Sequence, residues 1–381
     1  MRRPSMRPSP TSSPEESLLA SLRLAGIHGI GPGLRRLLFE RYGDAAGILA
    51  ASADELRKVA GIGPRLAEAI AGSDPTAARE LLSLCRARGV GILQESDDTF
   101  PAILRQIPDP PDLLFVRGSL EPADSLAVAV VGARHATAYG LRVAQRLGGS
   151  LARAGYTVVS GLARGIDSAA HQGALEAGGR TIAVLGSGVL EIYPPEHADL
   201  AERIEAAGAV ISESPPLATA SAGAFPRRNR IVSGLSLGVV VVEASTRSGA
   251  LITARLASEQ GREVFAVPGS IESRMSRGCH RLLKDGACLV EGVDDILDEL
   301  GPLFEATVSR DGCTVRSPAE LRLGGVERRV LEAVGEASEG RSIDEVIESA
   351  DLPAANVLAT VSVLESRRLV RRLPGNRLTR R

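Results

Sequence analysis

Between residues 126 and 290, short apolar segments alternate with amphipathic stretches of helical spacing. The segments expected to form strands are Leu126–Val131, Thr157–Ser160, Thr181–Leu185, Val210–Ser212, Val239–Glu243, Glu263–Val267 and Ala287–Val290. Continuous apolar strands that alternate with helices, such as Tyr139–Ala154 and Ile252–Gln260, predict an α/β fold with a parallel, doubly wound sheet covered on both faces. Ligands of such sheets bind outside the carboxyl ends of the strands, so the segments that follow the strands are where a site is expected.

A chain of 381 residues is too long for one ordinary core, so several domains are expected. Changes in the residue pattern divide it into a disordered tail (1–15), a helical domain (16–88), the α/β domain (89–300), a linker (301–322) and a C-terminal domain (323–381). Residues 89–124 are rich in Pro and Asp, and are expected to form loops and an edge strand that includes Leu113–Val116.

The helical domain contains the sequence Gly-Ile-Gly-Pro twice, at Gly29–Pro32 and at Gly61–Pro64. Each copy is expected to open a helix, because glycine permits the tight turn and proline suits the first helical position. The pair resembles a tandem helix-hairpin-helix, or SAM-like, domain. The free amides at such helix starts can hold a phosphate. Since few basic residues flank the two turns, the pair suits either DNA binding or a purely structural packing role.

The C-terminal domain is expected to be a winged helix, because three helical segments precede a basic hairpin. The helices are expected at Val326–Val334, Ser342–Ser349 and Pro353–Leu364, and the hairpin turns at Pro374-Gly375. No Lys or Arg occurs between Pro353 and Ser366, which makes the third helix a poor reader of a DNA groove. We therefore expect this domain to contact nucleic-acid backbone, including double-stranded DNA, or another protein, without reading sequence.

The composition excludes several classes of protein. A formal net charge of -1 excludes nucleic-acid binding through bulk charge, so any such binding must come from local patches. Four cysteines without a CxxC pair or a histidine cluster predict neither a metal site nor a disulfide framework. No apolar run reaches membrane-spanning length, and the N-terminus lacks the apolar stretch of a secretory signal. We expect a cytoplasmic protein without a membrane contact.

The hexapeptide Phe225–Arg230 places three arginines and an aromatic ring just before an apolar run. Cations beside a buried strand are costly unless they face solvent or a polyanion. Arginine forks next to a stacking ring suit single-stranded nucleic acid. The alternative is a solvated loop whose arginines pair with nearby acids.

The segments that follow four of the predicted strands bring further candidates to the same rim of the sheet. They combine backbone amides at helix starts with arginines, which is the composition of a phosphate-binding surface. Several phosphates in a row suit a polynucleotide better than one nucleotide, and Phe225 is placed to stack on a base. The candidate single-strand-binding residues are Gly132, Arg134, Ser160, Gly161, Arg164, Gly165, Phe225, Arg227, Arg228, Asn229, Arg230, Ser248 and Gly249.

Cofactor chemistry finds no support in the sequence. The dinucleotide fingerprint requires G-x-G-x-x-G after the first strand and an acid at the end of the second, and neither is present. A Walker lysine motif is absent as well. Asp167 and His171, four residues apart on one helix face, suit either an acid/base pair or a helix N-terminal acid with a structural hydrogen bond. The second interpretation is favoured, because no nucleophile or metal ligand accompanies them.

Several of these motifs, in this order, resemble the DNA processing protein A (DprA, or Smf) family. They are Ser160–Asp167, Ala170-His171, Thr181–Gly188, Tyr193-Pro194, Phe225–Ile231, Arg247–Thr253 and Val267–Gly269. The resemblance implies an extended Rossmann-like domain that binds single-stranded DNA independently of its sequence. It also implies homodimers through that domain, protection of incoming strands in natural transformation, and loading of RecA in recombination. The family usually has Ser or Thr where this chain has Ala133, so one hydroxyl donor to phosphate is missing.

A second resemblance, to nucleotide phosphoribohydrolases with the same Rossmann variant, predicts an enzyme instead. Their signature, P-G-G-x-G-T-x-x-E, requires a glutamate on the helix after the glycine turn. Aligning Ser248–Thr253 with that signature puts Ile252 and Thr253 where acids are expected. The alignment keeps the phosphate-binding turn and loses the carboxylate, which favours a binding protein without catalytic residues.

Overall fold

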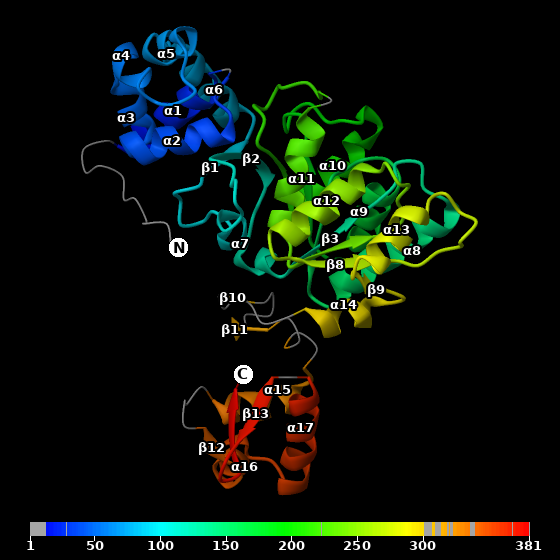
Figure 1. The fold of residues 1–381 in the computed structure, drawn as a ribbon. Helices are drawn as coiled ribbons and strands as arrows, with labels where there is room; N and C mark the ends of the chain where they lie inside the picture. The colour runs from blue at the N-terminus through cyan, green and yellow to red at the C-terminus, as the bar shows by residue number, and fades with distance from the viewer. Residues whose placement is uncertain are drawn as a thin grey trace.

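A computed structural model describes residues 13–27, 29–221, 223–300, 307–308, 314–317, 320, 323–335, 340–367 and 369–380 (Figure 1). Residues 1–12 of the predicted disordered tail (1–15) lie outside the described residues. The last two residues of that tail, Pro14 and Glu15, belong to helix α1 (Pro14–Ala25). Ser13 caps this helix and forms a reciprocal capping box with Glu16, which explains why the helix begins there. Most of the predicted linker at 301–322 also lies outside the described residues.

The central domain is built on a sheet whose strand order is β1-β2-β6-β5-β4-β3-β7-β8-β9. The strands are β1 (Gly91–Gln94), β2 (Leu113–Gly118), β3 (Ala127–Val131), β4 (Thr157–Ser160), β5 (Thr181–Leu185), β6 (Ala209–Ser212), β7 (Gly238–Val241), β8 (Glu263–Ala266) and β9 (Cys288–Leu289). Neighbouring strands from β6 to β9 are parallel, as predicted. β2 runs antiparallel to both of its neighbours, β1 and β6, so the sheet is mixed at one side.

Helices cover both faces of this sheet (Figure 1). One face packs against α7 (Ala102–Arg105), α11 (Ala224–Gly234), α12 (Gly249–Glu259) and α13 (Arg277–Lys284), and the other against α8 (Ala138–Arg153), α9 (Ile166–Glu176), α10 (Ala198–Ala207) and α14 (Val293–Glu299). Side chains alternate along each strand, so Ala127, Ala129 and Val131 enter one core while Val128 and Val130 enter the other. Burial on both faces explains the continuous apolar strands, and the predicted doubly wound, Rossmann-like fold is confirmed.

The strand order reverses at β3, which has β4 on one side and β7 on the other. In doubly wound sheets this switch point leaves a crevice at the carboxyl ends of the two strands. The sequence predicted a site at the carboxyl ends of the strands, and the strand order indicates that the segments after β3 and β7 are the ones that form it.

The prediction that Leu113–Val116 forms an edge strand is wrong. These residues belong to β2, which is hydrogen-bonded to β1 on one side and to β6 on the other. The edge is β1, and its four residues are all partly exposed, whereas the first four residues of β2 are buried. The apolar composition of Leu113–Val116 therefore reflects an interior position.

The helical domain contains α1, α2 (Pro32–Tyr42), α3 (Ala45–Ala50), α4 (Ala53–Leu56), α5 (Pro64–Ala71) and α6 (Thr76–Ala87). Both Gly-Ile-Gly-Pro segments open a helix, as predicted, since α2 and α5 begin at the two prolines. Gly29 and Gly61 adopt φ angles of 99° and 93°, which favour glycine. A Cβ atom at Gly29 would contact Leu66, and one at Gly61 would contact Leu34, so the two hairpins pack on each other symmetrically.

The C-terminal domain folds around its own core, with α15 (Gly325–Val334), α16 (Ile343–Ala350), α17 (Ala354–Ser366) and a small sheet. The strands of that sheet are β12 (Arg341–Ser342), β13 (Val370–Leu373) and β14 (Arg377–Arg380), in the order β12-β14-β13. Three helices followed by a hairpin confirm the predicted winged helix. Among the described residues, no single helix is long and apolar enough to span a membrane; only α16 and α17 together, with a 111° bend between them, meet that requirement.

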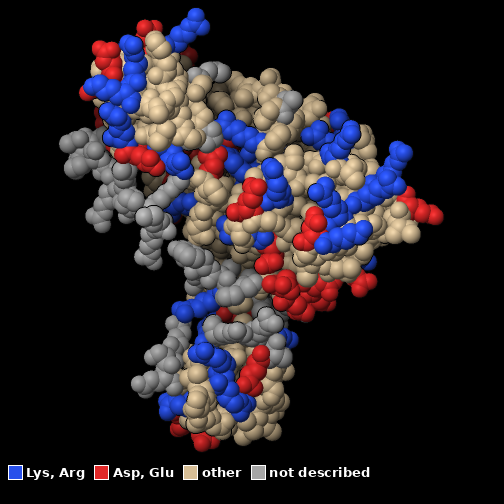
Figure 2. Space-filling view, in the orientation of Figure 1, with Lys and Arg blue, Asp and Glu red and all other residues tan. Residues whose placement is uncertain are grey.

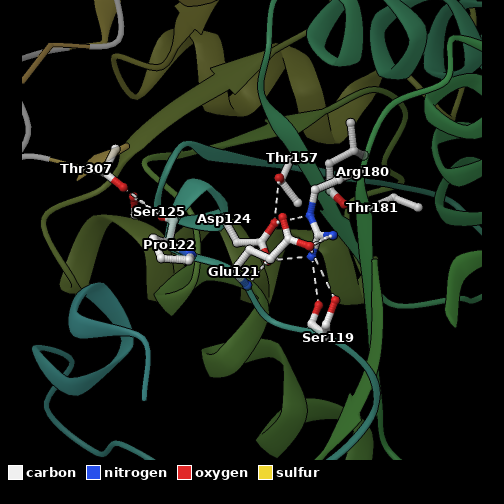
Figure 3. Close-up of polar contacts among 10 residues, drawn as sticks. Ser119, Glu121, Pro122, Asp124, Ser125, Thr157, Arg180, Thr181 and Thr307 are labelled. Atoms are coloured by element: carbon white, nitrogen blue, oxygen red, sulfur yellow. Dashed lines mark hydrogen bonds and ion pairs between the residues drawn. The ribbon is translucent and has the colours of Figure 1, made fainter. Parts of the chain in front are cut away.

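Part of the predicted linker is structured. β10 (Thr307–Val308) pairs with β11 (Thr314–Val315), and the Thr307 hydroxyl donates a 2.7 Å hydrogen bond to the Pro122 carbonyl. Figure 3 shows this contact beside the Arg180 side chain, whose guanidinium holds Asp124 at 2.9 and 2.8 Å and Glu121 at 2.7 Å. The Thr157 hydroxyl donates to the same Asp124 carboxylate at 2.8 Å. This network fixes the amino ends of β4 and β5, opposite the switch point.

Candidate nucleic-acid interface

A hollow of about 310 Å³ opens at the switch point. Its walls come from the loop after β3, the loop after β4, the first turns of α11 and α12, and the loop after β8. Eight of the predicted site residues line it, namely Gly132, Arg134, Gly161, Phe225, Arg228, Asn229, Ser248 and Gly249. Five do not, namely Ser160, Arg164, Gly165, Arg227 and Arg230. The structure therefore brings together the larger part of the predicted rim.

Close packing explains two of the predicted glycines, Gly132, which lines the hollow, and Gly165, which does not. A Cβ atom at Gly132 would lie 2.5 Å from the Ile166 side chain and 2.9 Å from the Glu243 carbonyl oxygen. At Gly165 the φ angle is 79°, and a Cβ atom there would lie 2.3 Å from the Ala133 carbonyl oxygen. Larger residues would push the loops after β3 and β4 apart, so these glycines keep the two loops packed together.

Arg134 and Phe225 form one edge of the hollow. The guanidinium carbon of Arg134 lies 4.9 Å from the centroid of the Phe225 ring, which is cation–π geometry. The Tyr193 ring packs against the Phe225 ring. The two ring centroids lie 5.8 Å apart, and the ring planes are inclined by 51°. The side chain of Arg134 is exposed, and no carboxylate among the described residues pairs with it. This edge therefore presents an unneutralised cation held against an aromatic face.

The hexapeptide Phe225–Arg230 is not a loop, as one of the two interpretations of the sequence had it, because it forms the first two turns of α11. Pro226 is tolerated there because the backbone amides of a first helical turn have no partner within the helix. The helical geometry then separates the three arginines. Arg227 and Arg230, three residues apart, both contact Glu213, whereas Arg228 points into the protein.

Arg228 is a buried residue of the hollow wall. Its Nη1 atom donates to the carbonyl of Gly161, at 2.7 Å, and to the carbonyl of Val184. Burial lowers the pKa of this guanidinium, and the charge of Asp167 opposes that shift. A Cβ atom at Gly161 would lie 2.1 Å from Nη1, so this glycine makes room for the arginine. Arg228 therefore ties α11 to the ends of β4 and β5.

Arg230 and Arg164 lie outside the hollow and are neutralised by acids. Arg230 forms ion pairs with Asp109 at 2.9 Å and with Glu213 at 2.7 Å, and its side chain is only 9% exposed. Arg164 pairs with Glu196. For Arg230 the structure matches the interpretation in which the arginines of the hexapeptide pair with nearby acids. Arg227, with 56% of its side chain exposed, keeps one face open to solvent beside Glu213.

The loop after β4 uses some of the amides that the sequence assigned to phosphate binding. The Asp167 carboxylate accepts from the amides of Gly161 at 3.2 Å and Ala163 at 3.3 Å. Burial raises the pKa of this carboxyl, against the effect of Arg228 and the two amides. The Ser160 hydroxyl donates to the Val130 carbonyl at 2.6 Å and is buried. Asp167 and Ser160 thus hold the loop from inside.

His171 is buried four residues after Asp167 and contacts β5. Its Nδ1 atom lies 2.6 Å from the Thr181 hydroxyl, which itself donates to the Val158 carbonyl. Because the hydroxyl hydrogen is used in that bond, the imidazole donates from Nδ1 to the hydroxyl oxygen. Burial, followed by the charges of His197 and Arg228, lowers the pKa of His171 to about 3. These contacts agree with the structural interpretation of the Asp167 and His171 pair.

Among the lining residues that the sequence did not identify as site residues are His135, Ser245 and Met275. His135 follows the predicted site residue Arg134, and Ser245 lies three residues before the predicted Ser248, so both could have been identified from their position in those loops. Met275 carries no such signal, because it lies in the loop after β8. The Ala244 amide donates to the Met275 carbonyl at 2.7 Å, and this contact brings the loop to the end of β7.

Comparisons with known proteins cover all three domains. Family models match residues 91–301 (DNA recombination-mediator protein A), 21–71 (SAM-like helix-hairpin-helix tandem) and 315–376 (DprA winged helix domain). Protein Smf from Synechocystis is 33% identical over 93% of this chain and 96% of its own length. Protein Smf from Escherichia coli is 41% identical over 74% of this chain and 76% of its own length.

The solved structures that are similar to this chain include two DNA processing proteins. DNA processing protein A from Streptococcus pneumoniae is 34% identical and aligns with a TM-score of 0.66, covering 74% of this chain and 98% of that protein. DNA processing protein A from Helicobacter pylori, described for its single-stranded DNA binding mode, is 29% identical and has a TM-score of 0.50. That alignment covers 54% of this chain and 93% of the Helicobacter protein.

Proposed function

The chain belongs to the DNA recombination-mediator protein A family, whose relatives are called DprA or Smf, and we propose that it binds single-stranded DNA independently of sequence. The observation that carries the proposal is Arg134, an exposed cation without an acid partner among the described residues, held over the Phe225 ring at the hollow. The Helicobacter relative, described as a single-stranded DNA binder, supports the same ligand.

The geometry of the hollow favours a single strand over a duplex. An aromatic ring at a concave wall can stack only on a base that is not already stacked and paired inside a helix. A volume of about 310 Å³ is at the lower end of small-ligand sites, which suits one flipped-out nucleotide. Arg134, Arg227 and the amides at the start of α12 would then contact the phosphates on either side. Asn229, whose side-chain amide is 3.4 Å from the Gly249 carbonyl, would hold that helix start in place.

We propose that the protein is not an enzyme. The hollow contains Ile252 and Thr253 where a phosphoribohydrolase of this Rossmann variant would need acids, and Asp167, the carboxylate in the wall, is engaged by two amides. A binding site for nucleic acid needs no general acid or base, whereas glycosidic cleavage does. Incubation with nucleoside monophosphates should release no free base, and release of base would favour the hydrolase.

The wider role is proposed from family membership. We propose that the protein acts in the cytoplasm as a homodimer formed through the central domain, that it protects incoming single strands in natural transformation, and that it helps to load RecA onto them. We propose domains at 16–88, 89–300 and 323–381, with the two outer ones as accessory modules. Arg371, exposed on β13 of the winged helix, would contact nucleic-acid backbone or a partner protein, whereas the neighbouring Arg372 pairs with Glu365.

The test is a fluorescence-anisotropy titration of the full chain with single-stranded and double-stranded oligonucleotides at two salt concentrations. We expect preference for the single strand, little difference between base sequences, and weaker binding at higher salt. Equal affinity for single and double strands would contradict the assignment of the hollow to an unpaired nucleotide. An absence of binding to either form would reject the proposed function as a whole.

A further inference from the structure

Three arginines of α8 form a stripe on one side of that helix. They are Arg142, Arg146 and Arg153, and all three are exposed. Because each residue turns an α-helix by about 100°, positions 142, 146 and 153 fall within about 40° of one another. The rise of about 1.5 Å per residue gives the stripe a length of about 17 Å. These residues do not line the hollow at the switch point.

The stripe lacks the acids that neutralise exposed arginines on other helices. Arg36, Arg255 and Arg281 each pair with an acid four residues further along their own helix. α8 contains neither Asp nor Glu, and its three arginines form no ion pair within the described part of the chain. Their contacts are neutral: Arg146 donates to the Glu291 carbonyl at 3.4 Å, and Arg153 donates to the Ser150 hydroxyl at 3.0 Å.

A shallow groove of about 340 Å³ runs beside this stripe, between α8 and α9. Gly149 and Gly173 form its floor, because the two helices approach closely there; a Cβ atom at Gly173 would lie 2.0 Å from the Gln145 carbonyl oxygen. The one acid among its lining residues, Glu176, accepts a 2.7 Å hydrogen bond from the Gln145 side chain. The groove therefore combines three cations with one carboxylate that is already engaged.

The stripe begins close to the hollow. α8 starts at Ala138, three residues after His135, which lines the hollow. The Thr137 amide and hydroxyl both donate to Glu243, at 2.8 and 2.6 Å, and this buried acid fixes the start of α8 at the end of β7. A DNA strand that leaves the hollow past His135 would therefore meet Arg142 first and could continue along the groove toward Arg153.

We propose that the α8–α9 groove is a second binding surface, which holds the sugar-phosphate backbone of a single DNA strand whose neighbouring nucleotide occupies the hollow. This inference rests on the proposed function and adds a direction to it, since a long strand would run from the carboxyl ends of the sheet toward the amino ends. Acidic side chains gather over α14 on the same domain (Figure 2) and would repel a path across that helix.

The test replaces all three arginines of the stripe by glutamine in the full-length chain and titrates two oligothymidylates, of about 5 and about 30 nucleotides. With one nucleotide in the hollow, the short strand extends only partly along the stripe, so its affinity should fall much less than that of the long strand. For the long strand, affinity should fall on the order of tenfold, and the salt slope should fall by about 2, because each single-strand phosphate contact contributes about 0.7. Replacing the three arginines by lysine keeps the charge and should restore the slope.

A matched control removes the same charge elsewhere, with Arg203, Arg255 and Arg281 changed to glutamine on α10, α12 and α13. An equal loss in this control would assign the effect to net charge and overturn the proposal. Wild-type binding of the long strand by the stripe variant would overturn it too, and so would an equal loss for both strands. If the stripe variant instead changes only the oligomeric state, the surface belongs to a second copy of the chain. Failure of the wild type to bind either strand would reject the proposed function itself.

Discussion

The guanidinium of Arg134 lies over the ring of Phe225 at 4.9 Å, although the two residues come from different strand ends, one after β3 and the other at the start of α11. The contact gives the cation a partner that leaves its charge unneutralised. It also fixes the ring at the hollow, where the part of this half-buried ring that Arg134 and Tyr193 leave uncovered can meet a base. We therefore propose that Arg134 contacts phosphate and Phe225 contacts a base, so the two contributions to binding should separate experimentally.

We predict that Arg134→Ala and Phe225→Ala weaken single-strand binding in different ways. Loss of Arg134 removes a phosphate contact, so the salt slope should fall by about 0.7. Loss of Phe225 removes base stacking worth about 1 to 3 kcal/mol, with little change in slope. Anisotropy titrations over a range of salt concentrations measure both quantities. The double variant should lose less than the sum, because the two side chains contact each other; strict additivity would show that the contact has no role in binding.

Arg227 and Arg230 share Glu213, yet we predict opposite phenotypes for their glutamine variants. Arg230→Gln leaves Asp109 without its partner and Glu213 with only the exposed Arg227, so it should lower the free energy of unfolding by about 1 to 3 kcal/mol. Arg227→Gln should leave stability nearly unchanged, because its pair is exposed, and should weaken DNA binding instead. Chemical denaturation and anisotropy, measured on both variants, distinguish the two roles. Loss of affinity in a fully stable Arg230→Gln protein would place that residue in the DNA contact after all.

The strands were predictable because their signal is local. Seven apolar segments matched β3 to β9 to within about two residues, since burial on both faces leaves a continuous apolar run in the sequence. The sequence of Phe225–Arg230 has no such signal. It lacks apolar periodicity because its buried positions are Arg228 and Arg230. The partners of Arg228, Gly161 and Val184, lie far away in the sequence. In the sequence alone, an arginine that is buried and donates to distant carbonyls cannot be told from an arginine in a solvated loop.

The lining of the hollow was predictable where a single loop contributes both a glycine and an arginine, as the loop after β3 does with Gly132 and Arg134. It was less predictable where packing decides the direction of a side chain. Arg164 and Arg230 follow the expected segments but turn to acids, Glu196 and Glu213, that no short motif connects with them. Met275 reaches the hollow only through a backbone hydrogen bond between two loops, and such contacts depend on the tertiary fold.

We predict that Gly173→Ala destabilises the central domain by about 1 to 3 kcal/mol, because the new Cβ atom would lie 2.0 Å from the Gln145 carbonyl oxygen and the two helices would have to separate. Gly33→Ala is the matched control. Gly33 also lies in a helix, but nothing stands within 4 Å of its Cβ position, so alanine there should be neutral or stabilise by up to about 1 kcal/mol. Thermal and denaturant unfolding measure the difference; a stable Gly173→Ala protein would mean that α8 and α9 can move apart freely.

We predict that His171 makes the fold sensitive to mild acid. Its pKa falls from 6.5 to about 3 on folding, chiefly through burial, so the unfolded chain binds the proton more readily than the native protein. The stabilisation is complete above about pH 6.5 and is lost as the pH falls toward 3. Between pH 7.5 and pH 5 the loss from this residue should be on the order of 2 kcal/mol.

Denaturant unfolding at the two pH values, in wild type and His171→Gln, measures that loss as the difference between their pH dependences. Thr181→Val is the control, because it removes the hydroxyl that contacts Nδ1 but leaves the imidazole buried. It should be less stable at both pH values and should retain the acid-sensitive loss. If His171→Gln shows the same pH dependence as wild type, the imidazole must reach solvent or gain a proton acceptor in the native state, and its neutral, buried role would be wrong.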